Sequence, residues 1–259
     1  MHGLFAHRIY IYSLNRSPLR KAFSASGGVF NSFCCLFSLT LLLFLAACSP
    51  FPKEGVKNFT LQQAPKARLT YVAIGASDTF GYGTADPATQ SWPFDLAHKL
   101  GPDVHLVNLG IPGIDAHQAL DLELPVALDA HPDLVTVWLA VNDLVDKVPL
   151  KSYRDDLNTL FTRLQAVAPH ARIVVANVPD LSFVPRFHTT DQSTLHKQVN
   201  DYNTVITDVI QSHHVVLVDL YTQWQELATH PEYISADGFH PSAVGYAELA
   251  EIFYQTLRT

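Results

Sequence analysis

Three polar side chains that are far apart in the sequence have the chemistry of an activated nucleophile. Ser77 directly follows the apolar run Leu69–Ile74. Near the C-terminus, Asp237 and His240 stand three residues apart. A serine hydroxyl is a weak nucleophile until a base takes its proton, and an imidazole whose tautomer is fixed by a carboxylate is a suitable base. The pattern predicts acyl transfer, with Ser77 as nucleophile, His240 as base and Asp237 as orienting acid.

Acyl transfer also requires hydrogen-bond donors for the oxyanion of its tetrahedral intermediate. Gly110 ends the segment Asn108-Leu109-Gly110, and Asn142 lies in the segment Val141-Asn142-Asp143; each segment lies at the end of an apolar run. A glycine lets a substrate approach the backbone closely. We therefore expect an oxyanion hole made of the backbone N–H groups of Ser77 and Gly110 and the side-chain amide of Asn142.

Five apolar runs alternate with helix-like segments and can position these residues. The runs are rich in β-branched residues and apolar on both faces, which is typical of buried parallel strands. Ligands of a parallel sheet bind beyond the carboxyl ends of its strands, so the candidate residues should converge at one edge. The predicted strands are Leu69–Ile74, Val104–Leu109, Leu134–Leu139, Ile173–Val178 and Val215–Leu220.

The segments between the runs carry signals of helices. Ser91 can cap the first of them, and Gly101 and Pro169 can end the first and the third. Alternating strands and helices predict one α/β domain with a doubly wound, mainly parallel five-stranded sheet. The predicted helices are Ser91–Leu100, Ala116–Leu128, Tyr153–Ala168, Thr194–Ser212 and Ser242–Arg258.

Taken in order, the four polar segments resemble the sequence blocks of the SGNH (GDSL-type) hydrolase family. The resemblance extends over about residues 69–258. It implies a flavodoxin-like three-layer α/β/α sandwich and serine esterase, lipase or thioesterase activity without a metal or cofactor. The segments similar to the nucleophile, glycine, asparagine and Asp-x-x-His blocks of the family are Gly75–Ser77, Asn108–Gly110, Asn142-Asp143 and Asp237–His240.

Two positions depart from the pattern of the family. Ala76 stands where the family usually has an aspartate before the serine, and Ala140 stands where its asparagine block usually begins with glycine. Neither position is assigned to proton transfer. The two departures support an alternative hypothesis, a surface protein that keeps the fold and binds glycan or lipid without catalysis.

Composition argues against several other classes of function. A net charge of −7 and a sequence pI near 6.0 are not those of a nucleic-acid-binding protein. Cys34, Cys35 and Cys48 all precede residue 69, which excludes a disulfide or a cysteine-ligated zinc in the main domain. The main domain also lacks the H-E-x-x-H and G-x-G-x-x-G patterns of metal and dinucleotide sites. The expected partners are small-molecule, lipid or carbohydrate esters, with acyl length and alcohol left open.

The first 68 residues have the layout of an export signal followed by a tether. Residues 1–28 contain four basic residues and no acidic one, and residues 33–47 are almost wholly apolar. Leu45-Ala46-Ala47-Cys48 then resembles the lipobox of bacterial lipoproteins, in which the cysteine is lipidated. We expect a signal peptide at 1–47, a lipidated N-terminus and tether at 48–68 and a hydrolase domain at 69–259. The protein would be anchored at the cell-surface or periplasmic face of a bacterial membrane; an uncleaved anchor is the alternative.

Overall fold

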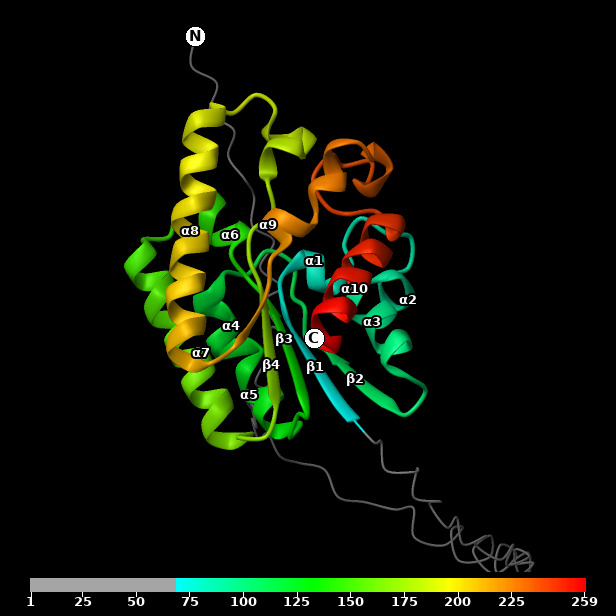
Figure 1. Ribbon diagram of the computed structural model, residues 1–259, viewed down its shortest axis with the longest axis vertical. Coiled ribbons are helices and arrows are strands. Elements are labelled where there is room, and N and C mark those ends of the chain that lie inside the picture. Colours follow the sequence, from blue (N-terminus) through cyan, green and yellow to red (C-terminus); the bar gives the residue numbers. More distant parts are fainter. Residues whose placement is uncertain (1–68) are drawn as a thin grey trace, which may run out of the picture. The chain divides into compact units, whose positions relative to one another are not determined.

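The computed structural model describes residues 69–259, and Figure 1 shows the arrangement of their helices and strands. The expected signal peptide, the lipidation site Cys48 and the tether lie outside the described residues. Five strands form one sheet, parallel throughout, in the order β2-β1-β3-β4-β5. They are β1 (Leu69–Gly75), β2 (Val104–Asn108), β3 (Leu134–Trp138), β4 (Arg172–Ala176) and β5 (Val216–Val218).

This strand order creates a crevice beyond β1 and β3. The chain moves from β1 to β2 on one side and then crosses to β3 on the other side of β1. In open α/β sheets, the point where the direction of winding reverses is the usual place for a ligand. The segments that follow β1, β2 and β3 therefore meet at the carboxyl edge of the sheet, and the predicted flavodoxin-like architecture is confirmed.

Burial decreases from the centre of the sheet to its edges. All five residues of β3 are buried, as are the last five of β1 and the last four of β4. No residue of the edge strand β2 is fully buried, and in β5 only Val218 is. The expectation of two-sided burial is thus confirmed for the three central strands and wrong for the edges, because an edge strand has a neighbouring strand on one side only.

Helices cover both faces of the sheet (Figure 1). On one face, stacking of the Trp92 and Phe253 rings, with centroids 4.1 Å apart, joins α3 to α10. On the other face, the Tyr153 and Tyr202 rings, 5.0 Å apart, join α7 to α8. These four helices confirm the predicted ones to within three residues at each end. Their bounds are α3 (Trp92–Leu100), α7 (Leu150–Val167), α8 (Gln192–His213) and α10 (Ala243–Arg258).

The predicted helix Ala116–Leu128 is wrong, because the structure divides it at Glu123. Helix α4 (Ala116–Leu122) ends there and α5 (Leu124–Asp129) begins. Pro125 is the cause, since its ring and its missing N–H exclude it from a helix interior but suit the first turn of a new helix. Glu123, which lies at the break, is fully buried.

The remaining connections contain short helical segments, two of which carry candidate residues. Ser77 begins α1 and Asn142 lies in α6. Within residues 69–259, no helix is long and apolar enough to cross a membrane. The short segments are α1 (Ser77–Phe80), α2 (Pro87–Gln90), α6 (Val141–Val145), α9 (Leu220–Gln223) and the 3₁₀ turns η1 (Leu181–Phe183), η2 (Pro185–Phe187), η3 (Gln225–Ala228) and η4 (Pro231–Tyr233).

Candidate active site

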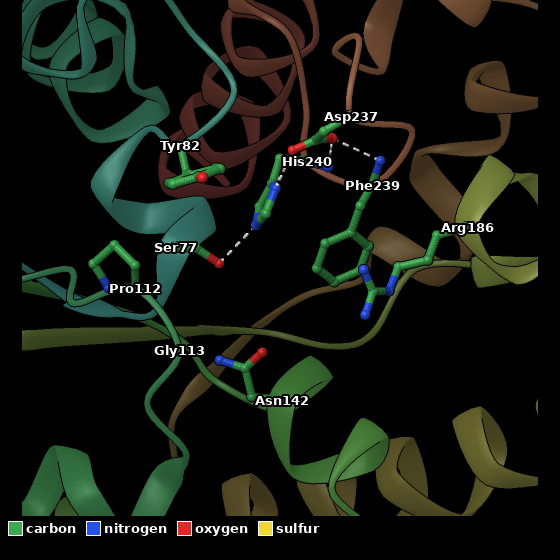
Figure 2. A pocket seen from close by; sticks show the side chains of 9 residues that line it. All are labelled: Ser77, Tyr82, Pro112, Gly113, Asn142, Arg186, Asp237, Phe239 and His240. Atoms are coloured by element: carbon green, nitrogen blue, oxygen red, sulfur yellow. Dashed lines mark hydrogen bonds and ion pairs between the residues drawn. The ribbon is translucent and has the colours of Figure 1, made fainter. Parts of the chain in front are cut away.

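The structure brings Ser77, His240 and Asp237 into one hydrogen-bonded line (Figure 2). Ser77 lies directly beyond β1, while His240 and Asp237 belong to the loop between η4 and α10. Nε2 of His240 lies 3.0 Å from Oγ of Ser77, and Nδ1 of His240 lies 2.6 Å from Oδ2 of Asp237. The nucleophile, base and acid expected from the sequence therefore meet at the carboxyl edge of the sheet.

The Asp237 carboxylate fixes the tautomer of His240. Partial burial pushes the pKa of Asp237 upward, but four hydrogen bonds outweigh this and lower the pKa to about 2. The donors are the His240 side chain, the backbone N–H groups of Phe239 and His240, and the Ser235 hydroxyl. An ionised carboxylate can only accept, so Nδ1 of His240 carries the proton. Nε2 then presents its lone pair to the Ser77 hydroxyl, as a general base requires.

Two aromatic rings restrict the orientation of the His240 imidazole. The centroids of the Tyr82 and Phe239 rings each lie 4.6 Å from that of His240. The Tyr246 hydroxyl on α10 donates to the Tyr82 carbonyl oxygen at 2.8 Å and so holds the Tyr82 segment. The imidazole thus packs against two aromatic rings, which restricts the rotamers open to it.

The segment after α1 also touches the loop that carries the base. Gly83 has a φ of +96°, and a Cβ at this position would lie 2.8 Å from the Pro241 carbonyl oxygen. Glycine alone combines this left-handed conformation with so close an approach. The contact joins the nucleophile segment to the base loop.

Asn142 is placed as a candidate oxyanion donor should be. It lines the same cleft as Ser77, and its Nδ2 donates to the Ile114 carbonyl oxygen at 2.7 Å. A side-chain amide has two N–H groups, so this bond orients the amide and leaves the second N–H for a ligand. Ser77 is the first residue of α1, and its own N–H therefore has no acceptor within that helix.

Gly110 has contacts that the sequence did not predict. Its N–H donates to Oδ1 of Asn108 at 3.0 Å. A Cβ at Gly110 would lie 2.3 Å from the Phe80 nitrogen, and Nδ2 of Asn108 donates to the Thr79 carbonyl oxygen at 2.8 Å. Glycine is therefore needed for close packing against α1. In this loop, Gly113 is the glycine that lines the cleft.

Asp143 ties the asparagine segment to a neighbouring helix. Its buried carboxyl group accepts the Ala116 N–H through both oxygens, at 3.2 and 3.3 Å. Burial raises the pKa of Asp143 to about 7. Since Asn142 bonds to Ile114 and Asp143 bonds to Ala116, the start of α4 holds the candidate oxyanion amide at two adjacent points.

A cleft of about 450 Å³ surrounds the Ser77 hydroxyl (Figure 2). No motif in the sequence singled out Tyr82, which follows α1, Arg186, which lies in η2, or Phe239, which lies inside the Asp-x-x-His segment. Within residues 69–259, no group of three or more histidine, cysteine or acidic side chains is arranged to hold a metal ion. The lining residues are Ser77, Tyr82, Pro112, Gly113, Asn142, Arg186, Asp237, Phe239 and His240.

Glu123, beneath the nucleophile segment, was also missed. Its Oε1 accepts the Gly75 N–H at 3.3 Å, and its Oε2 has no hydrogen-bond partner among the described residues. Burial raises the pKa of Glu123 to about 9, and the single bond from Gly75 opposes this only in part. Glu123 is thus a neutral carboxylic acid at pH 7. Its sequence signal is an acidic residue between Leu122 and Leu124, directly before Pro125.

The two alanines that depart from the family pattern are both buried next to the triad. Ala76 and Ala140 line one small cavity together with Asp78, which follows the nucleophile. Burial raises the pKa of Asp78 to about 6. The departures therefore change the packing and charge behind Ser77 and leave the bonds of the triad in place.

Comparison with known proteins agrees with this geometry. Residues 73–248 match the GDSL-like Lipase/Acylhydrolase family. The chain belongs to this family. The matched residues include the whole triad, and the GDSL hydrolase is accordingly an enzyme of the serine esterase and lipase type.

Individual relatives of the GDSL hydrolase are esterases of several kinds. An arylesterase of Vibrio mimicus is 26% identical over 204 residues, which cover 77% of this chain and 93% of that protein. The psychrotrophic esterase EstA of Pseudoalteromonas sp., solved in a form inhibited by monoethylphosphonate, is 18% identical with a TM-score of 0.59, over 73% of this chain and 97% of that one. A family 3 carbohydrate esterase of Clostridium thermocellum is 22% identical with a TM-score of 0.57, over 72% and 94%. The two solved structures share its fold.

Proposed function

We propose that the GDSL hydrolase cleaves carboxylic esters or thioesters through an acyl-enzyme on Ser77. The observation that carries the proposal is the line of hydrogen bonds from Ser77 through His240 to the ionised Asp237. This arrangement supports the proposal, because a nucleophile, its base and the orienting acid must lie within hydrogen-bond reach of one another.

The reaction proceeds in two steps, acylation of Ser77 and then deacylation by water. Oγ of Ser77 attacks the carbonyl carbon while its proton passes to Nε2 of His240, and a tetrahedral oxyanion forms. Its collapse breaks the bond to the alcohol or thiol, which leaves with the proton from His240. Water then attacks the acyl group by the same route and releases the acid and free Ser77. A second alcohol in place of water would give acyl transfer by the same chemistry.

The oxyanion is assigned to the N–H of Ser77 and the amide of Asn142. The N–H of Gly110 becomes a third donor only if its bond to Asn108 opens. Loss of one oxyanion donor typically costs about 3 kcal/mol of transition-state stabilisation, which corresponds to more than a hundredfold in kcat. Asn142→Ala should show this loss in kcat, whereas KM should change much less.

The proposal is tested with p-nitrophenyl esters of increasing acyl length. Aryl esters are the first choice, because one relative is an arylesterase and the cleft of about 450 Å³ is large enough for an aromatic leaving group. Ser77→Ala should lower kcat/KM at least about a thousandfold. Ser152→Ala, on the exposed face of α7, is the matched control and should behave as wild type. Hydrolysis that persists in purified, folded Ser77→Ala protein would refute the assignment.

The non-catalytic alternative predicts a different result from the same protein. A fluorophosphonate probe should label wild type at Ser77 and leave Ser77→Ala unlabelled. Folded wild type that resists the probe yet binds a glycan or lipid saturably would favour the alternative.

The proposal includes export and attachment to a membrane through a lipid on Cys48. Its support is the sequence alone, namely the basic segment, the apolar segment and Leu45-Ala46-Ala47-Cys48. Mass spectrometry of the protein expressed in a bacterium should find a diacylated Cys48 at the mature N-terminus, and Cys48→Ser should abolish the modification. An intact leader in the wild type would contradict this part of the proposal.

A further inference from the structure

Arg186 lines the cleft but has no part in the proposed reaction. It lies in η2, and its backbone N–H donates to the Gly238 carbonyl oxygen at 2.9 Å. Its guanidinium lies over the Phe239 ring, with Cζ 4.9 Å from the ring centroid. Figure 2 shows this guanidinium against Phe239, beside the open space between that ring and Asn142. Arg186 is thus held to the base loop by its backbone and by its side chain.

The guanidinium of Arg186 has no ion pair and no hydrogen bond to any residue in 69–259. Acidic partners are abundant, since these residues include 23 aspartates and glutamates against nine lysines and arginines. Four of the other basic side chains do pair with carboxylates. Arg186 is exposed and forms none of these ion pairs, and among residues 69–259 it is the basic residue that lines the cleft. The paired residues are Lys99, Lys151, Arg154 and Lys197.

The N–H groups of the guanidinium are available to a ligand, since none of them bonds to a residue in 69–259. A guanidinium that lies on an aromatic ring uses its face for the contact, while its N–H groups point outward in the plane. This planar fork matches the two oxygens of a carboxylate or phosphate. The contact with Phe239 also restrains the long side chain, so less conformational entropy is lost when an anion binds.

We propose that Arg186 binds an anionic group of the substrate and makes the GDSL hydrolase selective for esters that carry a carboxylate or similar oxyanion near the scissile bond. The inference rests on the proposed function of the cleft as an ester site. Asp237 is the carboxylate that shares the cleft lining, and its four hydrogen bonds commit it to the base loop. The strongly acidic domain repels anions at long range, so selectivity has to come from this short-range contact.

Two pairs of esters that differ in one charge test the proposal. On the acyl side, 4-nitrophenyl hydrogen glutarate is compared with its neutral methyl ester. On the alcohol side, 4-acetoxybenzoate is compared with its methyl ester. The measured quantity is the ratio of kcat/KM for the anionic ester to kcat/KM for the neutral one. The ester pair whose ratio changes when Arg186 is replaced identifies the side of the scissile bond that faces Arg186.

Three variants separate a local contact from a change of overall charge. Arg186→Met should lower the ratio about tenfold in at least one pair, mainly through KM, because the contact is present in both ground and transition states. Arg186→Lys should keep part of the preference, because it retains the charge without the planar fork. Arg163→Met removes the same charge from the exposed surface of α7 and should leave the ratio as in wild type. An unchanged ratio in Arg186→Met, or an equal fall in Arg163→Met, would overturn the proposal.

A binding measurement separates this inference from the proposed reaction. The Ser77→Ala protein is titrated calorimetrically with 4-nitrophenyl hydrogen glutarate, with and without Arg186→Met. Weaker binding in the double variant supports the role of Arg186 even if wild type proves inactive. The difference in affinity between the two proteins should also shrink as NaCl is added. Equal binding by both proteins counts against Arg186 even if Ser77 is the nucleophile. Thermal melting confirms that each variant is folded.

Discussion

The two sides of the triad are held in place by different physical means. The base lies on a partly exposed loop in which the Asp237 carboxylate accepts four hydrogen bonds, which outweigh its partial burial and lower its pKa to about 2. The nucleophile begins a buried turn next to the segment that Glu123 contacts. Burial raises the pKa of Glu123 to about 9, although a hydrogen bond from the Gly75 N–H opposes the rise. Carboxyl groups of similar intrinsic acidity thus have opposite charge states at pH 7, because one accepts four hydrogen bonds and the other is buried with a single hydrogen bond.

This contrast indicates which changes each side tolerates. The base side depends on polar groups that accept or donate, so it should be sensitive to a change of one atom in a carboxyl group. The nucleophile side depends on packing, with Gly110 against α1 and Gly75 above Glu123, so it should be sensitive to added volume and to buried charge.

Replacing each carboxyl group by its amide should give the largest difference in kcat between the base side and the nucleophile side. Asp237→Asn is expected to lower kcat by roughly four orders of magnitude, because an amide that donates to His240 favours the wrong tautomer. Glu123→Gln keeps the oxygen that accepts the Gly75 N–H and should retain kcat within a few fold. Both are measured with p-nitrophenyl acetate on protein shown to be folded by circular dichroism. Similar losses in the two variants would remove the contrast.

The stability of the Glu123→Gln protein should differ from that of wild type in a pH-dependent way. The folded-state pKa of Glu123 is raised from 4.5 to about 9, so the unfolded chain loses its proton first as the pH rises. The free energy of unfolding of the wild type should therefore fall between about pH 5 and 9, with a contribution of up to about 1.4 kcal/mol per pH unit from this group.

Urea denaturation at several pH values measures this effect. The difference between Glu123→Gln and wild type should grow with pH, to a few kcal/mol in favour of the variant near pH 8. A difference that stays constant from pH 5 to 9 would show that Glu123 is ionised in the folded protein.

A methyl group added at Gly110 should destabilise the nucleophile side. Gly110→Ala places a Cβ 2.3 Å from the Phe80 nitrogen, and backbone atoms cannot yield as a flexible side chain can. We expect about 1–3 kcal/mol of lost stability and a reduced kcat, because α1 and Ser77 are displaced together. At Gly113 nothing lies within 4 Å of an added Cβ, so Gly113→Ala has only the cost of its φ of +86° and should lose less stability. Thermal melting of both proteins makes the comparison.

The smallest effect should be the contribution of Asp237 to stability in acid. Its pKa is lowered in the folded state, so the stabilisation is present above about pH 4 and is lost as the pH falls towards 2. The carboxylate is partly exposed to solvent, which limits the contribution to below about 1 kcal/mol. The difference in unfolding free energy between wild type and Asp237→Asn should shrink over this range. A difference that grows instead would contradict the lowered pKa.

The sequence by itself determined most of the elements and named the three side chains that the structure joins by hydrogen bonds. Each central strand is a local apolar run, and each functional segment is a local group of polar residues directly after such a run, so both can be recognised without long-range information. The same reasoning failed at Ala116–Leu128, where the helical pattern was given more weight than Pro125. The structure also gives Gly110 a packing role against α1 that the sequence did not reveal, beside its predicted role as an oxyanion donor.

Only the tertiary structure decided how these segments act on one another. The order β2-β1-β3-β4-β5 brings Asn142 beside Ser77, and the winding of loops brings Tyr82 and Arg186 to the same cleft. Charge states also depend on the fold, because a pKa is set by the water that is excluded and by the donors that distant segments supply. For that reason the sequence could name Asp237 as the acid of the triad but could not reveal Glu123 as its neutral counterpart below the nucleophile.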